Sequence, residues 1–244
     1  ELQRIFNTII IAKQNYRSMK TKFFLALIAT SLVLGVASCR PNQTPKPGPT
    51  PTPNPPAQEE VKGLKGYVDA SKYENWVYYS LKDNKEVEVS DYKNSDAWDI
   101  AFHRFDIRLN CGESGKGKGA AVFSGVTEME KATKVPTEGW VTDAIGTITI
   151  KFNMGGGSHD TNHEQTGYNH LITGKKTDRG DMSGGWLDYD LGNMPPSVRL
   201  SGKVFFVKCA DGKIARIQFT DCKDKTGRKN GFISFTYDYN VSAK

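Results

Sequence analysis

The sequence predicts a single all-β domain, an antiparallel sandwich or a barrel-like fold, over residues 59–244. Apolar and polar residues alternate with a period of two along several segments of this region. An Asp-Gly pair stands between two strand-like runs, and this is a strong signal for a β-hairpin. No segment carries a sustained apolar stripe with the period of a helix. The length of the region suits one sandwich or barrel.

The first predicted strands lie at residues 98–102 and 105–109. Apolar residues occupy even positions in the first run and odd positions in the second. One extra residue between them would shift the parity in this way, so we expect a β-bulge near His103 and Arg104.

Three further predicted strands follow. Apolar residues alternate from Ile148 to Met154 and from Ile233 to Val241, which predicts strands with one buried face. The run 204–207 is apolar at every position, as expected for a central strand covered on both faces. The turn is predicted at Asp211–Gly212, between this run and the strand-like residues 214–219.

The first 58 residues do not belong to the predicted domain. Residues 19–38 read as a lipoprotein signal peptide, because a basic start and an apolar run precede small residues and then Cys39, the expected lipidation site. An uncleaved membrane anchor is the alternative, although the apolar run is short. Residues 1–18 form an upstream extension that we interpret as not native. Residues 39–58 hold eight of the 11 prolines and predict an extended stalk.

The charge distribution argues against a nucleic-acid partner. The chain has a net charge of +6, but residues 59–244 contain 26 basic and 26 acidic side chains. The basic excess therefore lies in the leader, and the domain lacks the positive surface that binds DNA or RNA.

The glycine-rich segment 112–119 nearly matches a phosphate-binding P-loop, but Gly119 stands where the motif needs Ser or Thr. A strand-like run follows instead of a helix, so we predict a turn between strands.

Besides Cys39 the chain has Cys111, Cys209 and Cys222. A direct bond between Cys209 and Cys222 is not expected from their places on the hairpin; pairing of Cys111 with one of them stays open, and no disulfide framework is predicted.

Three histidines, His159, His163 and His170, fall within twelve residues, and imidazole binds zinc, copper and haem iron. Met194 lies in a second polar loop rich in Gly and Pro, where a thioether can also bind iron. Nothing in the sequence resembles a nucleophile elbow or a zinc-protease helix.

Several blocks together resemble one family. They are residues 95–119, 171–176, 183–187 and 204–207, and they are similar to the HmuY-like haem-binding lipoproteins of anaerobic Gram-negative bacteria. The similarity extends over nearly all of residues 62–244. The resemblance implies an all-β haemophore and not an enzyme. Such a protein takes haem from host haemoproteins and delivers it to a TonB-dependent outer-membrane receptor. It would be a lipoprotein of the outer membrane, exposed at the cell surface and open to shedding.

The resemblance also implies two axial iron ligands, one from each of two loops. The first falls on His159, but the second falls on Leu191, which cannot bind iron. We therefore expect His159 and Met194 as ligands. Their substitutes, also counted among the haem-binding residues, are Met154, His163 and Met182.

Two further expectations concern the haem. A thioether ligand favours ferrous iron, so haem should bind more tightly when reduced. Tyr78 and Tyr79, in the predicted strand 76–80, are expected to form an aromatic wall against the porphyrin. Two alternatives to the haemophore stay open. One is a zinc-binding or enzymatic β-domain that uses His159, His163 and His170; the other is a stalked, adhesin-like surface module.

Overall fold

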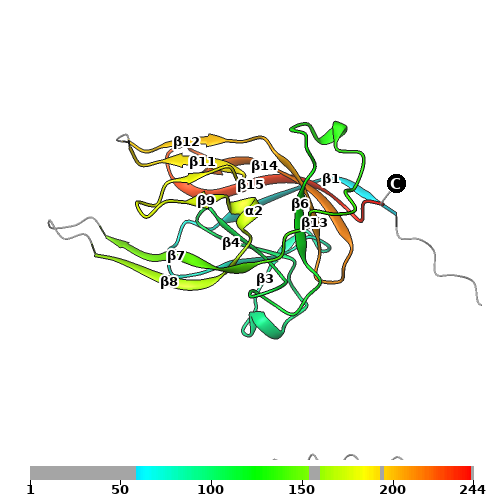
Figure 1. The fold of residues 1–244 in the computed structure, drawn as a ribbon, viewed down its shortest axis with the longest axis horizontal. Coiled ribbons are helices and arrows are strands. Elements are labelled where there is room, and N and C mark those ends of the chain that lie inside the picture. Colours follow the sequence, from blue (N-terminus) through cyan, green and yellow to red (C-terminus); the bar gives the residue numbers. More distant parts are fainter. Residues whose placement is uncertain (1–58, 154–159, 193–194, 243–244) are drawn as a thin grey trace, which may run out of the picture. The chain divides into compact units, whose positions relative to one another are not determined.

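The computed structural model describes residues 59–153, 160–192 and 195–242, and antiparallel strands make up most of the regular secondary structure in this part (Figure 1). The predicted all-β fold is confirmed. The helical elements are one short α-helix, α2 (His170–Thr173), and two single turns of 3-10 helix, η1 (Tyr92–Asn94) and η2 (Met129–Lys131). No helix within the described ranges is long and apolar enough to span a membrane. Cys39, the signal segment and the stalk lie outside those ranges.

The largest sheet has five antiparallel strands and forms one layer of the fold. Its order is β1 (Val61–Asp69), β15 (Asn230–Tyr239), β14 (Ile214–Lys223), β13 (Val204–Lys208) and β6 (Ala120–Phe123). The alternation predicted from Ile233 onward is confirmed, because Ile233, Phe235, Tyr237 and Tyr239 are all buried.

A four-stranded sheet packs against the five-stranded one. Its order is β3 (Lys85–Val87), β2 (Val77–Ser80), β4 (Ile100–His103) and β5 (Asp106–Leu109). Phe235 joins the two layers, with its ring centroid 5.4 Å from that of Phe102 and 5.3 Å from that of Tyr79. Aromatic rings bury large apolar areas, so these contacts form the centre of the core.

Two smaller sheets complete the fold. The first has the order β12 (Ser197–Leu200), β11 (Leu187–Asp190), β10 (Met182–Ser183) and β9 (Lys175–Lys176). Trp186, just before β11, anchors it to the core through Phe219 of β14 at 4.8 Å between centroids. The second is the hairpin of β7 (Ala144–Asn153) and β8 (Asp160–Tyr168).

The predicted central strand is confirmed. β13 pairs with β14 on one side and β6 on the other. Phe205 and Val207 face the main core, while Val204 and Phe206 face a second, smaller cluster with Val122 and Val135. Each face of β13 is therefore covered, which explains its continuous apolar run.

The hairpin at Asp211–Gly212 is also confirmed. Gly212 has φ +88°, and the Cys209 N–H donates to Lys213 O at 2.7 Å, so the turn is closed at those two residues. In this hairpin Lys208 faces Ile214. Cys111, Cys209 and Cys222 are buried free thiols, so Cys111 does not pair with either of the others.

The predicted bulge at His103–Arg104 is wrong. β4 and β5 form a hairpin closed by the two-residue turn Arg104–Phe105, with Phe102 opposite Ile107. Directly opposed residues share one face of the sheet, so an even position faces an odd one and the parity shift needs no extra residue. Register irregularities occur in other pairs of the described strands: between Thr149 and Lys151 in β7, between Val61 and Leu64 in β1, and between Phe219 and Lys223 in β14.

The glycine-rich segment between β5 and β6 is a turn, as predicted. Its amides are used within the fold: the Gly117 N–H donates to Asn110 Oδ1 at 3.0 Å, and the Gly119 N–H donates to Asn110 O at 3.0 Å. The turn wraps around a buried asparagine, so these amides are not available to a phosphate.

Candidate functional site

Two hairpins carry the sequence-predicted iron ligands. β7 and β8 pair from Ala144–Tyr168 to Asn153–Asp160, and β11 and β12 pair from Leu187–Leu200 to Asp190–Ser197. Figure 1 shows both hairpins extending from the domain in the same direction. His159, Met154 and Met194 belong to the connections at their ends and lie outside the described residues.

Lys176 of β9 joins the β7–β8 hairpin to the sheet that contains β11 and β12. Its Nζ donates to Thr147 O of β7 at 3.0 Å and pairs with the Asp106 carboxylate of β5. The ammonium also lies 4.6 Å from the ring centroid of Tyr168 in β8. The side chains of Lys176 and Asp106 are only 19% and 8% exposed, so this ion pair is partly shielded from solvent.

A row of stacked side chains runs from the first hairpin to the second. Phe152 of β7 lies 5.9 Å from Tyr73, and the Arg104 guanidinium lies 4.5 Å from Tyr73 and 5.7 Å from Phe105. Phe105 in turn lies 5.1 Å from Tyr189 of β11. We call these five residues the aromatic row. Phe152 is 46% exposed, although large apolar rings are usually buried, so it offers an apolar surface on the hairpin that carries His159.

The chain is fixed where it leaves β11. Asp181 Oδ1 accepts the Leu191 N–H at 2.8 Å, and Oδ2 accepts from Arg179 Nε at 2.9 Å. The hydrogen bond from Leu191 and the nearby Arg179 lower the pKa of Asp181. Leu191, at the position where the resemblance implies a second ligand, therefore has a defined backbone but an inert side chain.

The two tyrosines of the predicted wall lie on opposite faces of the sheet, so they do not form one surface, and a contact of Tyr78 with haem stays a prediction. Tyr79 is 4% exposed and packs in the core, and its hydroxyl donates to Asn84 Oδ1 at 2.7 Å. Successive residues of a strand point to opposite faces, so Tyr78 lies on the other side of the sheet and lines a cavity. Only Tyr78 can meet a ligand there.

The remaining candidate ligands within the described residues differ in their access to solvent. Met182 is 6% exposed and belongs to the main core, so the structure does not support it as an axial ligand. His163 is exposed on β8, with Nδ1 3.3 Å from Thr149 Oγ1. His170 stacks on Tyr168 at 4.3 Å. Within the described ranges no three His, Cys, Asp or Glu side chains gather as a metal cluster.

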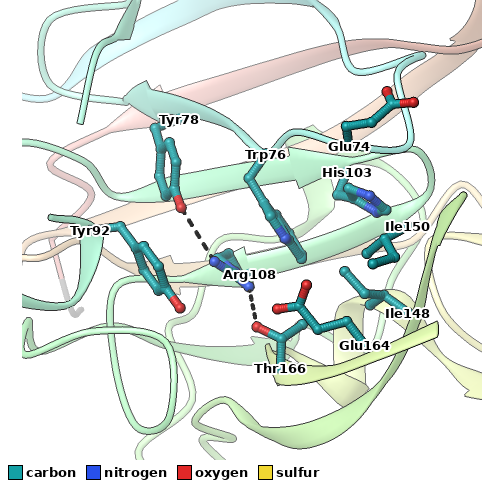
Figure 2. Close-up of a pocket in the computed structure, with 10 residues that line it drawn as sticks. All are labelled: Glu74, Trp76, Tyr78, Tyr92, His103, Arg108, Ile148, Ile150, Glu164 and Thr166. Atoms are coloured by element: carbon teal, nitrogen blue, oxygen red, sulfur yellow. Dashed lines mark hydrogen bonds between the residues drawn. The ribbon is translucent and has the colours of Figure 1, made fainter. Parts of the chain in front are cut away.

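A cavity of about 210 Å³ lies between the β7–β8 hairpin and the β3-β2-β4-β5 sheet. Figure 2 shows Arg108 of β5 at its centre. Lining residues come from both elements, from the segment before β2 and from η1: Glu74, Trp76, Tyr78, Tyr92, His103, Arg108, Ile148, Ile150, Glu164 and Thr166. The sequence analysis missed this cavity. Arg108 alternates with Ile107 and Leu109 like any solvent-facing residue of a strand, and only the tertiary fold covers it.

Comparisons with known proteins agree with the fold. The profile of the HmuY protein family matches residues 72–237. A structure from Bacteroides vulgatus, described as an HmuY-like haem-binding protein, is 27% identical, with a TM-score of 0.57 over 75% of this chain and 93% of that one. The apo HmuY analogue of Tannerella forsythia is 27% identical, with a TM-score of 0.58 over 77% and 100%.

A third structure, a protein of Bacteroides fragilis described as a lipoprotein, is 23% identical. Its TM-score is 0.54 over 74% of this chain and 89% of that one, a likeness in fold. The search of curated proteins found no match.

Proposed function

The chain belongs to the HmuY family, and we propose that it binds haem between the β7–β8 and β11–β12 hairpins. The observation that carries the proposal is the direction of these hairpins. Both extend from the domain on the same side, and Lys176 joins the first to the sheet that contains the second (Figure 1). Their connections contain His159 and Met194. The relative from Bacteroides vulgatus is described as haem-binding, which supports the same assignment.

The described residues fit an iron porphyrin. Haem is a large apolar plate, and sites for such ligands are mainly apolar with few polar groups. The exposed ring of Phe152 and the partly exposed Tyr73 beside it supply such a surface. Imidazole and thioether groups, in turn, are established axial ligands of haem iron.

In this proposal His159 and Met194 hold the iron, and Met154 and His163 are the alternative ligands. Bound haem supplies a redox-active iron, and a neutral thioether favours its ferrous form. The chain's own residues bind and orient the ligand; Asp181 fixes the backbone at Leu191, from which Met194 is three residues away. No bond of the ligand is broken, so the role is capture and release and not catalysis.

The cellular role follows from the leader and the family. We propose that Cys39 is lipidated and that residues 39–58 hold the domain away from the outer membrane at the cell surface. The domain would take haem from host haemoproteins and deliver it to a TonB-dependent receptor. The Bacteroides fragilis relative is described as a lipoprotein, which supports the anchoring.

The ligand assignment is tested by titrating haemin into the purified chain and following the Soret band. We expect a shifted, saturable Soret band with the wild type. In His159→Ala and Met194→Ala the shift should be lost, or the haem affinity should be at least about ten-fold lower. His170→Ala and Met129→Ala are the matched controls, since His170 stacks on Tyr168 and Met129 packs against the second cluster. If both His159→Ala and Met194→Ala bind haem with wild-type affinity, the assignment of these residues as axial ligands is wrong. Zinc binding without any haemin shift would replace the proposal by a zinc site.

A further inference from the structure

Arg108 is a buried cation whose hydrogen-bonding capacity is not filled. It is 1% exposed. One terminal nitrogen donates to Thr166 Oγ1 at 2.7 Å and the other to Tyr78 Oη at 3.3 Å. Nε has no hydrogen-bond partner among the described residues, and no ion pair in that part of the chain joins the guanidinium to a carboxylate. Its positive charge acts on the buried Asp143, and Glu74 and Glu164 line the same cavity, but among the described residues none of these carboxylates forms an ion pair with it. The unfilled hydrogen-bonding capacity of this buried guanidinium therefore suits an anion from outside the chain.

The space beside Arg108 has the character of a small-molecule site. Its volume is about 210 Å³, below the range typical of drug-sized ligands, so it admits a small ligand only. Two aromatic rings flank the guanidinium, with centroids 3.6 Å away for Trp76 and 4.8 Å away for Tyr92 (Figure 2). Ile148 and Ile150 of β7 supply an apolar wall.

The charges around the cavity restrict the anion. Glu74 and Glu164 are exposed and line the cavity with Arg108. They oppose a second negative charge, and a phosphate carries about −1.5 to −2 at neutral pH. A carboxylate carries a single charge, and its planar oxygens match the N–H groups of a guanidinium.

We propose that this cavity binds a small monocarboxylate, with the anionic end on Arg108 and an apolar or aromatic body against Trp76 and the two isoleucines. The site is separate from the proposed iron ligands and does not depend on haem binding. Because Thr166 and Ile148 belong to the β7–β8 hairpin, an occupied cavity also adds contacts between that hairpin and the sheet beneath it.

The test is a calorimetric titration of the full chain with benzoate, beside benzyl alcohol as the neutral analogue of the same shape and inorganic phosphate. We expect benzoate to bind at least about ten-fold more tightly than benzyl alcohol, because a hydrogen bond to a charged group is the stronger kind. Phosphate should not compete. Equal affinity for benzoate and benzyl alcohol, or displacement of benzoate by phosphate, would overturn the proposal.

Two variants locate the binding site. Arg108→Met should reduce benzoate affinity at least about ten-fold, with folding checked by circular dichroism. The side chain of Glu164 is exposed, so Glu164→Gln should leave folding intact. The substitution removes a negative charge that repels the ligand, so benzoate affinity should rise about two- to five-fold. Glu130→Gln, in η2, is the matched control and should change nothing. Unchanged benzoate affinity in Glu164→Gln would contradict the site even if Arg108→Met does not fold.

Discussion

Asp143 is a buried carboxyl that joins three elements at the start of β7. Its Oδ2 accepts the Leu109 N–H of β5 at 2.8 Å, and its Oδ1 accepts from the Asn169 amide, at the cap of α2, at 3.1 Å. Burial raises the pKa of Asp143 to about 6, although these hydrogen bonds act in the opposite direction. The ionised form therefore destabilises the folded state relative to the neutral form.

This shift predicts a pH dependence. The folded pKa lies above the unfolded one, so the stabilisation from Asp143 is complete below about pH 4 and is lost as the pH rises to about 6, a change on the order of 3 kcal/mol. Asp143→Asn lacks this titration, so its loss of stability should be larger at pH 4 than at pH 7.5. Urea unfolding at both pH values measures it, with exposed Asp178→Asn as the control. An equal loss at both pH values would contradict the assignment.

Arg104 holds the β4–β5 turn in an unusual conformation. It has φ +54°, a region that disfavours side chains, and long-range contacts compensate for this. Its backbone N–H donates to Ala70 O at 2.9 Å, and its guanidinium donates to Ser71 O at 2.9 Å and Asn230 O at 3.2 Å.

Two substitutions separate the backbone from the side chain. Arg104→Ala should reduce the free energy of unfolding by about 2 kcal/mol, because the guanidinium contacts are lost. Arg104→Gly should lose about 1 kcal/mol less, since glycine adopts positive φ without strain. Thermal or urea unfolding of both variants measures the difference. An alanine variant as stable as the glycine variant would mean that the turn is not strained.

At the level of elements, Lys176 joins the β7–β8 hairpin and β5 to the sheet that contains the second hairpin. Lys176→Met leaves the largely buried Asp106 carboxylate without its ammonium partner, so we expect a loss of about 2 kcal/mol in the free energy of unfolding. If haem lies between the hairpins, its affinity should fall as well. Lys175→Met, exposed on the same strand, is the control for both measurements. Unchanged stability and haem affinity in Lys176→Met would show that the contact does not organise the site.

Some elements could be predicted from local sequence and others could not. The run 204–207 and the Asp211–Gly212 turn are readable because continuous apolarity and a glycine with positive φ are local properties. The turn at Arg104 was missed because arginine is not a turn residue. Its conformation depends on carbonyls 33 and 126 residues away in the chain. Such contacts leave no periodic signal in the sequence.

For the whole molecule, only some of the functional residues could be predicted from the sequence. The resemblance drew attention to His159 and Met194, and the fold was predictable because strands with one buried face alternate apolar and polar residues. The buried Arg108 was not predictable, because its contacts with Tyr78 and Thr166 connect positions 30 and 58 residues apart. The residue types of Tyr79 and Met182 suggest contacts with haem, but both side chains are buried. Exposure cannot be read from residue type alone.

We propose that the full chain binds haem and holds it more tightly when the iron is reduced. The most direct measurement is a pair of Soret titrations of the intact protein, one with ferric haem in air and one with haem reduced by dithionite. We expect saturable spectral shifts in both states and a lower dissociation constant for reduced haem. A spectrum identical to that of free haem in both states would contradict haem binding, and equal or tighter binding of ferric haem would contradict the thioether ligand.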